Sequence, residues 1–373
     1  MARRRRSYEP VPARESFQEG GAAARRTQAA LLLSIGAAVA AETHRVPDPE
    51  DLALPPLAPL AHPPPIPLAR AAGRLDMSTA EYVSGFEGVI SDEEPARLTH
   101  DLYETPEVDT AAALVEAGLH SRSRLVRTAA ATAALDTTGP REDVVAVLEQ
   151  SAGARDADVR EMARTGLARA RPDHPLLDRY VVGGRGPGHR EEPSHTAVVS
   201  HGTWAAKSTW WRPGGSFYRY LDAQRPPLHL HSESFGWSGD YSDGTRSLAA
   251  DDLIDWVAAQ HLERPDHLAH SHGATVANLA TRRGLELGRL VLMGCPVHTD
   301  WLPDLRNVKA LLDVRVKLDL VIMADRGGQR LPARFRDERK VHEERNGWFS
   351  HAATHDPDYW DEHDLFARLS SIR

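Results

Sequence analysis

The stretch that decides the fold runs His267-Leu268-Ala269-His270-Ser271-His272-Gly273-Ala274. Its first residues are typical of a short buried strand, and residues 273–283 have the pattern of a helix that Gly284 ends. Ser271 therefore lies on the turn between the strand and the helix. Ala269 and Gly273, two positions away on each side, are small enough to leave room for the backbone that crosses such a tight turn. This setting predicts that Ser271 is a nucleophile.

Around this turn, short apolar runs alternate with helical segments over positions 195–373. That alternation is typical of the α/β class, in which a mostly parallel sheet is flanked by crossover helices. A long helix is predicted over residues 247–261, because Ala249, Leu253 and Val257 fall on one face. The predicted strands are 196–200, 228–230, 267–270, 290–293 and 314–316.

Two acidic residues are candidates to support a catalytic histidine. Residues 314–321 have the pattern of a late strand, and Asp319 would project from its end. Asp325 also follows an apolar run and opens a glycine loop, so it is the alternative to Asp319. An acid in this position holds the imidazole in its working tautomer and offsets the charge of the imidazolium.

Two histidines near the C-terminus are candidates for the general base. His351 and His355 precede Asp356-Pro357-Asp358, which is typical of a helix start, with Trp360 on the packing face of that helix. His351, one loop before this helix, is the first choice, and His355 is the alternative. The candidates then follow Ser271 in the chain order serine, acid, histidine.

A fourth feature is His201-Gly202-Thr203-Trp204, which directly follows the predicted strand 196–200. Alone, this segment is typical of a surface turn. Together with the three features above, it makes residues 195–373 resemble the lipase and esterase branch of the α/β-hydrolase superfamily. The segment Phe235-Gly236-Trp237-Ser238-Gly239 and the helix after it also resemble a motif of bacterial lipase-like members.

The resemblance implies a serine esterase that needs no cofactor. Ser271 would attack an ester carbonyl, His351 would carry the proton, and water would release the acid from the acyl-enzyme. Backbone N–H groups of Thr203 and His272 would form the oxyanion hole, and His201-Gly202 would shape the turn. The same triad could serve an amidase, a thioesterase or an acyltransferase, and a non-catalytic binding scaffold is the competing class.

The sequence departs from the family pattern at two points. Ala269 stands where the turn usually has its first glycine, and nothing before residue 195 predicts the usual first two strands. The short segment between Cys295 and the strand before Asp319 leaves no room for a large lid domain. We therefore expect a compact variant of the fold.

Aromatic residues near the oxyanion turn are candidates for the substrate site. Trp204, Trp210 and Trp237 could form an apolar wall for an acyl or aromatic substrate. A loop folded over the sheet, with its rings buried, accounts for such a cluster equally well. A metal site at His267, His270 and His272 is not favoured, because alternate side chains of a strand point to opposite faces.

The first half of the chain predicts no chemistry. Residues 1–105 contain an Arg-rich start, an Ala-rich apolar run at 29–41 and a Pro-rich linker, so the start fits either a secretory signal or a packed helix. Residues 106–180 have a helical pattern in which the motif at 126–130 recurs at 159–163, and they resemble HEAT-type repeats. Such a segment could bind a protein partner. The glycine cluster at 183–188 is typical of a hinge.

The composition limits the classes of binding partner but does not determine the cellular compartment. The net charge of the 373 residues is −8, which argues against nucleic acid. The single cysteine, Cys295, excludes a disulfide framework within the chain and a cysteine-rich zinc site. The apolar run at 29–41 is too short to span a bilayer as a helix. A cytoplasmic location is the first choice, and a secreted one is the alternative if residues 1–41 act as a signal.

Overall fold

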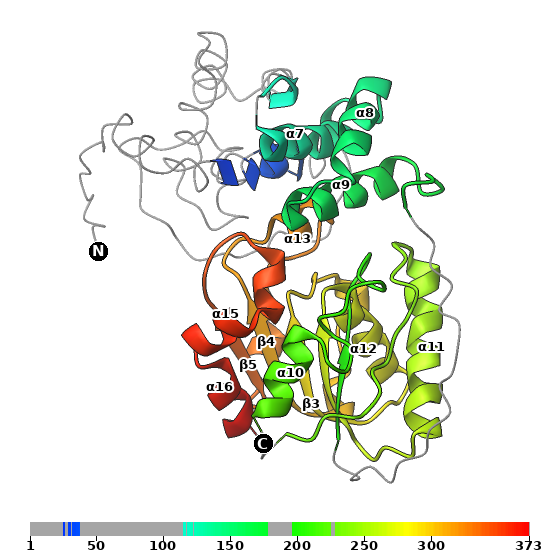
Figure 1. Ribbon diagram of the computed structural model, residues 1–373, viewed down its shortest axis with the longest axis vertical. Coiled ribbons are helices and arrows are strands. Elements are labelled where there is room, and N and C mark those ends of the chain that lie inside the picture. Colours follow the sequence, from blue (N-terminus) through cyan, green and yellow to red (C-terminus); the bar gives the residue numbers. More distant parts are fainter. Residues whose placement is uncertain are drawn as a thin grey trace, which may run out of the picture. The chain divides into compact units, whose positions relative to one another are not determined.

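The computed structural model describes residues 25–26, 29–30, 32–37, 115–116, 118–121, 123–177, 196–224 and 228–372. The chain divides into two units (Figure 1). The helical unit comprises residues 1–171 and 323–330, and the α/β unit comprises residues 172–322 and 331–373. The predicted linker, at 42–75, and the predicted hinge, at 183–188, lie outside the described residues.

A parallel five-stranded sheet forms the centre of the α/β unit, with the strands in the order β1-β2-β3-β4-β5. A sheet whose strands follow the chain order places its right-handed crossovers on a single face. Segments from other parts of the chain must then cover the opposite face. The strands are β1 (Ala197–Ser200), β2 (Asp266–His270), β3 (Leu287–Met293), β4 (Val308–Arg315) and β5 (Val341–Arg345).

Helices cover both faces of this sheet (Figure 1). The crossover face carries α11 (Asp243–Ala259), α12 (His272–Arg282) and α14 (Ala333–Arg336), with the short turns η2 (Thr299–Trp301) and η3 (Leu305–Asn307) between β3 and β4. The opposite face carries α10 (Ser216–Ala223), α15 (Pro357–Glu362) and α16 (Leu365–Ser371). Trp360 of α15 is fully buried there, and Asp356 caps the helix through the Asp358 N–H at 2.9 Å.

The α/β class and the parallel sheet are therefore confirmed, while two strand predictions need correction and one strand was not predicted. Residues 228–230 form only an isolated bridge to Ala197. The predicted strand 314–316 overlaps only the last two residues of β4, which runs from Val308 to Arg315, and Asp319 lies in the loop beyond it. The sequence did not predict β5, because its side chains are polar and half-buried after Val341, as suits a sheet edge.

The helical unit contains three described helices that pack on one another: α7 (Arg124–Thr137), α8 (Glu142–Ser151) and α9 (Ala157–Ala170). Ser123 and Asp156 cap α7 and α9 by accepting hydrogen bonds from the third residue of each helix. Small residues allow close packing, since a Cβ at Gly36 would lie only 2.8 Å from Ala133 Cα. The resemblance of this unit to HEAT repeats stays a prediction.

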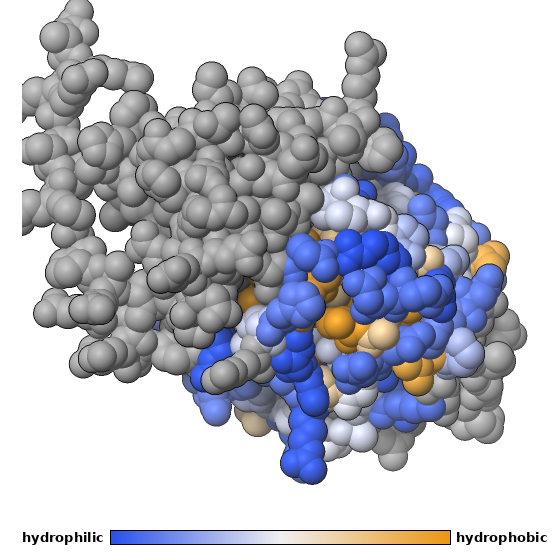
Figure 2. Space-filling view, turned by 90° about the horizontal axis from the view of Figure 1, so that it is seen from above, coloured by the Kyte–Doolittle hydropathy of each residue, from blue (hydrophilic) through white to orange (hydrophobic). Residues whose placement is uncertain are grey.

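The described part of the Ala-rich run, at 29–30 and 32–37, is helical and largely buried. Leu32, Leu33 and Ile35 are each less than 5% exposed. Within the described residues, no helix combines the length and apolar character needed to cross a membrane. On the face shown in Figure 2, the described surface is mostly hydrophilic, with hydrophobic residues in small separate groups.

Candidate active site

Ser271 occupies a strained turn between β2 and α12. Its backbone has φ 51° and ψ −132°, a combination that side-chain-bearing residues rarely adopt. The Ser271 N–H donates to the carbonyl of Met293, the last residue of β3, at 2.8 Å. The turn is thereby fixed at the carboxyl edge of the sheet, where parallel α/β folds bind their ligands.

Small residues make this turn possible. A Cβ at Gly273 would overlap the carbonyl oxygen of His201, and a Cβ at Gly202 would lie 2.5 Å from the Cβ of Ser271. The loop after β1 therefore packs directly against the turn. Ala269, which stands where the family pattern has glycine, is fully buried in the core.

Asp319 and His351 form a buried pair at the same edge. His351 Nδ1 lies 2.6 Å from Asp319 Oδ2, and both residues are about 1% exposed. Asp319 Oδ1 accepts the N–H groups of Val321 at 3.0 Å and Ile322 at 3.1 Å, both in α13 (Leu320–Ala324). The carboxylate is thus held on one side by backbone donors and presents its other oxygen to His351.

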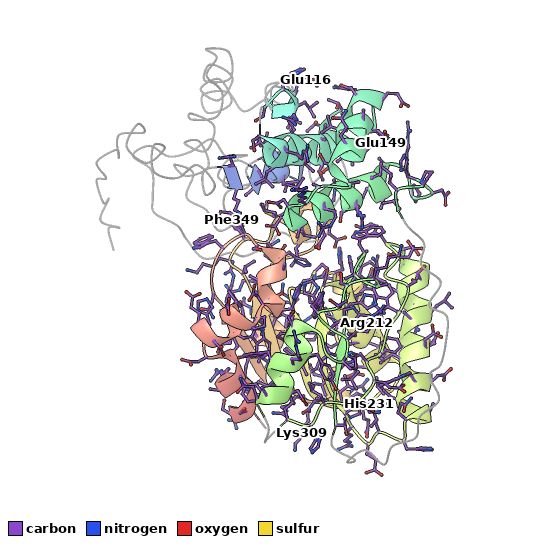
Figure 3. All side chains as sticks on the ribbon, viewed as in Figure 1. Glu116, Glu149, Arg212, His231, Lys309 and Phe349 are labelled. Atoms are coloured by element: carbon purple, nitrogen blue, oxygen red, sulfur yellow. The ribbon has the colours of Figure 1, made fainter. Side chains whose placement is uncertain are left out.

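The loop after β5 brings His351 to this carboxylate. The backbone of Phe349, labelled in Figure 3, forms an isolated bridge with Asp319. His351 then opens the short turn η4 (His351–His355). The alternative acid, Asp325, lies in the segment 323–330, which groups with the helical unit. Of the two candidate acids, the structure brings Asp319 to His351.

Gly294, directly after β3, lies between the turn of Ser271 and the ring of His351. Its φ is 58°, and a Cβ there would lie 3.2 Å from His351 Nδ1 and Cε1. The carbonyl of the preceding residue, Met293, accepts the Ser271 N–H, so Gly294 adjoins both the turn of Ser271 and the ring of His351. Sequence reasoning missed Gly294, although a glycine at the end of an apolar strand was the available signal.

The alternative base, His355, has a different environment. Its ring stacks on Trp210, with centroids 3.9 Å apart, and lies 4.6 Å from the ring of His270. Burial, helped by the charge of His351, lowers the pKa of His355 to about 3 and that of His270 well below 6.5. The rings of His270 and His355 therefore stay neutral beside His351.

The turn after β1 is braced by core residues. Trp237 Nε1 donates to the His201 carbonyl at 2.8 Å, while Trp204 N donates to Gly239 O at 2.9 Å. His201 is fully buried, and burial lowers its pKa to about 4. Thr203 follows this brace and is 9% exposed.

The three tryptophans predicted as a substrate wall separate in the structure. Trp237 is 3% exposed and lies in the core below the turn, so it supports the turn rather than lining a wall. Trp210 lies beside the His270 and His355 rings, and Trp204 stacks on Tyr241 with centroids 6.1 Å apart. The sequence could not show on which side of the loop each ring lies.

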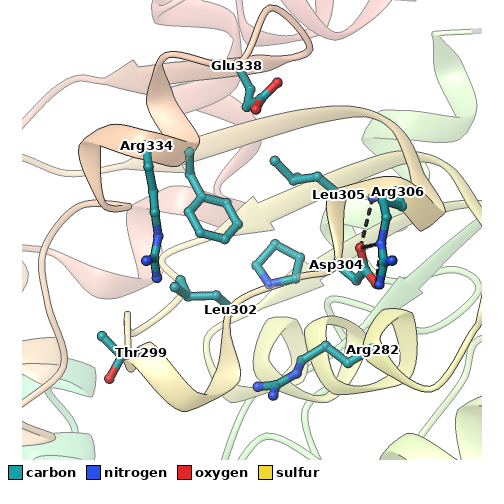
Figure 4. A pocket seen from close by; sticks show the side chains of 10 residues that line it. Arg282, Thr299, Leu302, Asp304, Leu305, Arg306, Arg334 and Glu338 are labelled. Carbon is teal, nitrogen blue, oxygen red and sulfur yellow. Dashed lines mark hydrogen bonds and ion pairs between the residues drawn. The ribbon is translucent and has the colours of Figure 1, made fainter.

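A pocket of about 640 Å³ opens elsewhere on the α/β unit, between α12, η2, η3 and α14 (Figure 4). Its floor is apolar and its rim carries Arg282, Arg306 and Arg334. Ser271, Asp319 and His351 do not line it. Among the described residues, no cluster of three or more His, Cys, Asp or Glu side chains could hold a metal ion.

Comparisons with known proteins find similarity to solved structures alone. No family model matches the chain, and no curated protein matches it. A proposed hydrolase of the alpha/beta superfamily from Xanthomonas campestris pv. campestris is 16% identical, with a TM-score of 0.33, over 47% of this chain and 98% of its own. A protein of unknown function from Agrobacterium tumefaciens, a proposed alpha/beta hydrolase, is 11% identical, with a TM-score of 0.34, over 48% of this chain and 88% of its own.

An uncharacterized protein from Bacillus cereus is also similar, at 11% identity and a TM-score of 0.30, over 74% of this chain and 96% of its own. Identities of 11–16% and TM-scores of 0.30–0.34 do not carry an activity from these proteins to this chain. What the α/β unit does must be inferred from its own residues.

Proposed function

We propose that this chain is a serine hydrolase that cleaves carboxylic esters through an acyl-enzyme on Ser271. The observation that carries the proposal is the buried Asp319–His351 pair, 2.6 Å apart, at the same sheet edge as the strained turn of Ser271. A serine hydroxyl is a weak nucleophile unless a neighbouring base removes its proton. An imidazole becomes such a base when a carboxylate fixes its tautomer.

Asp319 has the geometry for that role. Its Oδ2 faces His351 Nδ1, so the proton of the neutral imidazole lies on Nδ1 and Nε2 keeps its lone pair. In the proposed reaction, Nε2 takes the proton of Ser271 as its Oγ attacks the ester carbonyl. His351 then gives this proton to the departing alcohol, and a water molecule releases the acid by the same two steps.

The oxyanion that forms during attack needs donors that are already in place. His272 is the first residue of α12, and the N–H groups in the first turn of a helix point out of its N-terminal end. Its N–H and that of Thr203 are the proposed donors. The contact of Gly202 with Ser271 supports this assignment, because it holds the loop after β1 against the turn. One such donor typically contributes about 3–4 kcal/mol to lowering the barrier.

Asp319 is the proposed counter-charge of the imidazolium that His351 forms in this reaction. His270 and His355, the two rings near it, keep pKa values well below neutrality, so neither adds positive charge at pH 7. The buried carboxylate of Asp319 is then the charged group nearest to the imidazolium of His351. Exclusion of water strengthens this attraction.

A fluorophosphonate probe tests the proposal, because it labels a serine only when that serine is activated. We expect the wild-type protein and a Ser371→Ala variant to be labelled, since Ser371 is an exposed residue of α16. Ser271→Ala should not be labelled, and its hydrolysis of 4-nitrophenyl butyrate should fall by roughly 10⁶-fold.

Two outcomes would count against the proposal. Labelling that persists in Ser271→Ala would place the reactive serine elsewhere. A wild-type protein that is folded but never labelled would favour the competing proposal of a non-catalytic binding scaffold. Hydrolysis of an anilide at the rate of the matched ester would move the proposal from esterase to amidase.

A further inference from the structure

Arg246 is a buried charge whose hydrogen bonds are incomplete. It lies in the first turn of α11 and is only 3% exposed. Its Nη2 pairs with Asp243 Oδ1 at 2.5 Å, but the Asp243 side chain is 74% exposed. Arg246 Nε and Nη1 are buried and have no hydrogen-bond partner among the described residues. Burying such donors without acceptors costs stability, so these two donors call for an acceptor that the described residues do not supply.

Two aromatic rings hold this guanidinium. Arg246 Cζ lies 4.5 Å from the ring centroid of Trp301 and 5.2 Å from that of Tyr241. Both ring faces attract the cation, and both residues are only partly buried. Trp301 belongs to η2, a turn of three residues. The rings therefore form a cage that keeps the charge in place while remaining close to the surface.

The cage lies beside the proposed active site. The ring of His272, the residue after Ser271, is 5.6 Å from Tyr241 and 6.2 Å from Trp301 between centroids. On the other side, Tyr241 stacks on Trp204, the residue after Thr203. Arg246 is thus connected through single rings to both segments that carry the proposed oxyanion donors.

The position of α11 adds to the positive potential. The helix runs from Arg246 in its first turn to the start of β2, so its N-terminus lies at the carboxyl edge of the sheet, as Ser271 does. A helix N-terminus favours a nearby negative charge. A buried guanidinium and a helix N-terminus then act together on the same side of the nucleophile.

We propose that Arg246 binds the carboxylate of an anionic substrate, so that this site hydrolyses monoesters of dicarboxylic acids. This inference rests on the proposed serine hydrolase activity. The acyl chain would lie between the partly exposed rings of Trp204, Tyr241 and Trp301, with its ester carbonyl at Ser271 and its carboxylate at Arg246. A single guanidinium beside one exposed carboxylate matches a monoanion, whereas a phosphate dianion would leave a second charge uncompensated.

Binding to a variant that cannot turn over gives a test that does not depend on activity. In the Ser271→Ala background, titration calorimetry compares monomethyl glutarate with methyl valerate, which has a methyl group in place of the carboxylate. We expect monomethyl glutarate to bind at least 10-fold more tightly, which corresponds to about 1.4 kcal/mol, because only its carboxylate can accept charge-assisted hydrogen bonds from Arg246. Adding Arg246→Gln should weaken its binding about 30-fold, and Arg246→Lys should restore part of the loss.

The Asp243→Asn variant distinguishes a binding role of Arg246 from a packing role. If Arg246 only packs, removing its partner with Asp243→Asn loosens the cage and gives no gain in affinity. If Arg246 binds a carboxylate, the same change removes a competing negative charge and should tighten binding of monomethyl glutarate about 3-fold. Arg264→Gln is the matched control, because Arg264 is exposed and pairs with Glu286 at the opposite end of β2.

Turnover adds the second readout. In the protein with Ser271 intact, kcat/KM for monomethyl glutarate should exceed that for methyl valerate, and Arg246→Gln should abolish this preference, measured as the ratio of the two kcat/KM values within the same variant. Equal binding of the two esters, or an unchanged Kd in a folded Arg246→Gln variant, would overturn the inference. Carboxylate binding by a protein that the fluorophosphonate never labels would support Arg246 as an anion site and sink the hydrolase proposal alone.

Discussion

Replacing Asp319 by asparagine probes the proposed triad most directly. Asp319 Oδ1 accepts the N–H groups of Val321 and Ile322, while Oδ2 faces His351 Nδ1 at 2.6 Å. An asparagine has one oxygen and one NH₂ group in place of the two oxygens. The two backbone donors require the oxygen, because turning the amide would set its NH₂ against them at a cost of about 1–3 kcal/mol for each lost bond. The NH₂ group of the substituted side chain must then face His351.

That orientation reverses the tautomer of His351. Its Nδ1 would have to accept a hydrogen bond from the amide, which moves the imidazole proton to Nε2, the atom that must take the proton of Ser271. The fold should remain intact, because the side chain keeps its shape and its backbone bonds. We expect kcat for 4-nitrophenyl butyrate to fall by about 10⁴-fold, which corresponds to roughly 5 kcal/mol of barrier.

The assay compares this variant with Asp325→Asn, which changes the alternative acid in the same way. Initial rates and the rate of fluorophosphonate labelling are measured for both, with circular dichroism as the check on folding. Asp325→Asn should stay within a few-fold of the wild type, because Asp319 is the acid that contacts His351. A loss below about 10-fold in Asp319→Asn, or a greater loss in Asp325→Asn, would refute the reasoning.

Three further expectations concern single positions. Gly294→Ala should lower kcat by about 10²-fold, because the added Cβ would displace the ring of His351. Gly284 is the control: its φ is also positive, at +98°, but an added Cβ would have nothing within 4 Å, so Gly284→Ala should keep its activity. Burial lowers the pKa of His267 to about 4, so the stability that its neutral ring contributes is present above pH 6.5 and is lost as the pH falls toward 4. Thermal melts at several pH values should therefore show a smaller loss of Tm in acid for His267→Gln than for a variant of the exposed His229. Asp156→Ala should reduce the free energy of unfolding of the helical unit by about 1 kcal/mol in denaturant titrations, because it removes the cap of α9.

The sequence was most informative where the sheet is buried. Strands β1 and β3 are buried and mostly apolar, as parallel strands covered by helices are. The start of β4 was missed because Asp313 and Arg315 interrupt its apolar run, although they pair within the core at 2.6 Å. β5 was missed because an edge strand has one exposed side and carries charges. A pattern of hydrophobicity cannot reveal a charge that is buried with its partner.

At the site, chain order and local motifs supplied the candidates and favoured Asp319 and His351, but they left Asp325 and His355 as alternatives. Asp319 and Asp325 both follow apolar residues, and only the bridge between Asp319 and Phe349 brings one of them to a histidine. His355 remained the alternative base until its stacking on Trp210 distinguished it from His351, which contacts the carboxylate. These distinctions depend on which loops meet in space. The role of Arg246 had no sequence signal, since its partner Trp301 is far away in the chain.

The order of the strands explains why these loops meet. Neighbouring strands lie about 4.8 Å apart, so Ser271 after β2 and the loop after β4 are separated by about 10 Å across the sheet edge. His351 comes from the loop after β5, one strand further away. In the proposed triad it must extend back over β4 and β3 to contact both Asp319 and Ser271. Gly294 at the end of β3 leaves the space in which the ring of His351 lies, and Asp319 after β4 meets that ring on its way. Four consecutive strands thus carry the proposed nucleophile, the space for the ring, the proposed acid and the proposed base in the order in which they stand in the sheet.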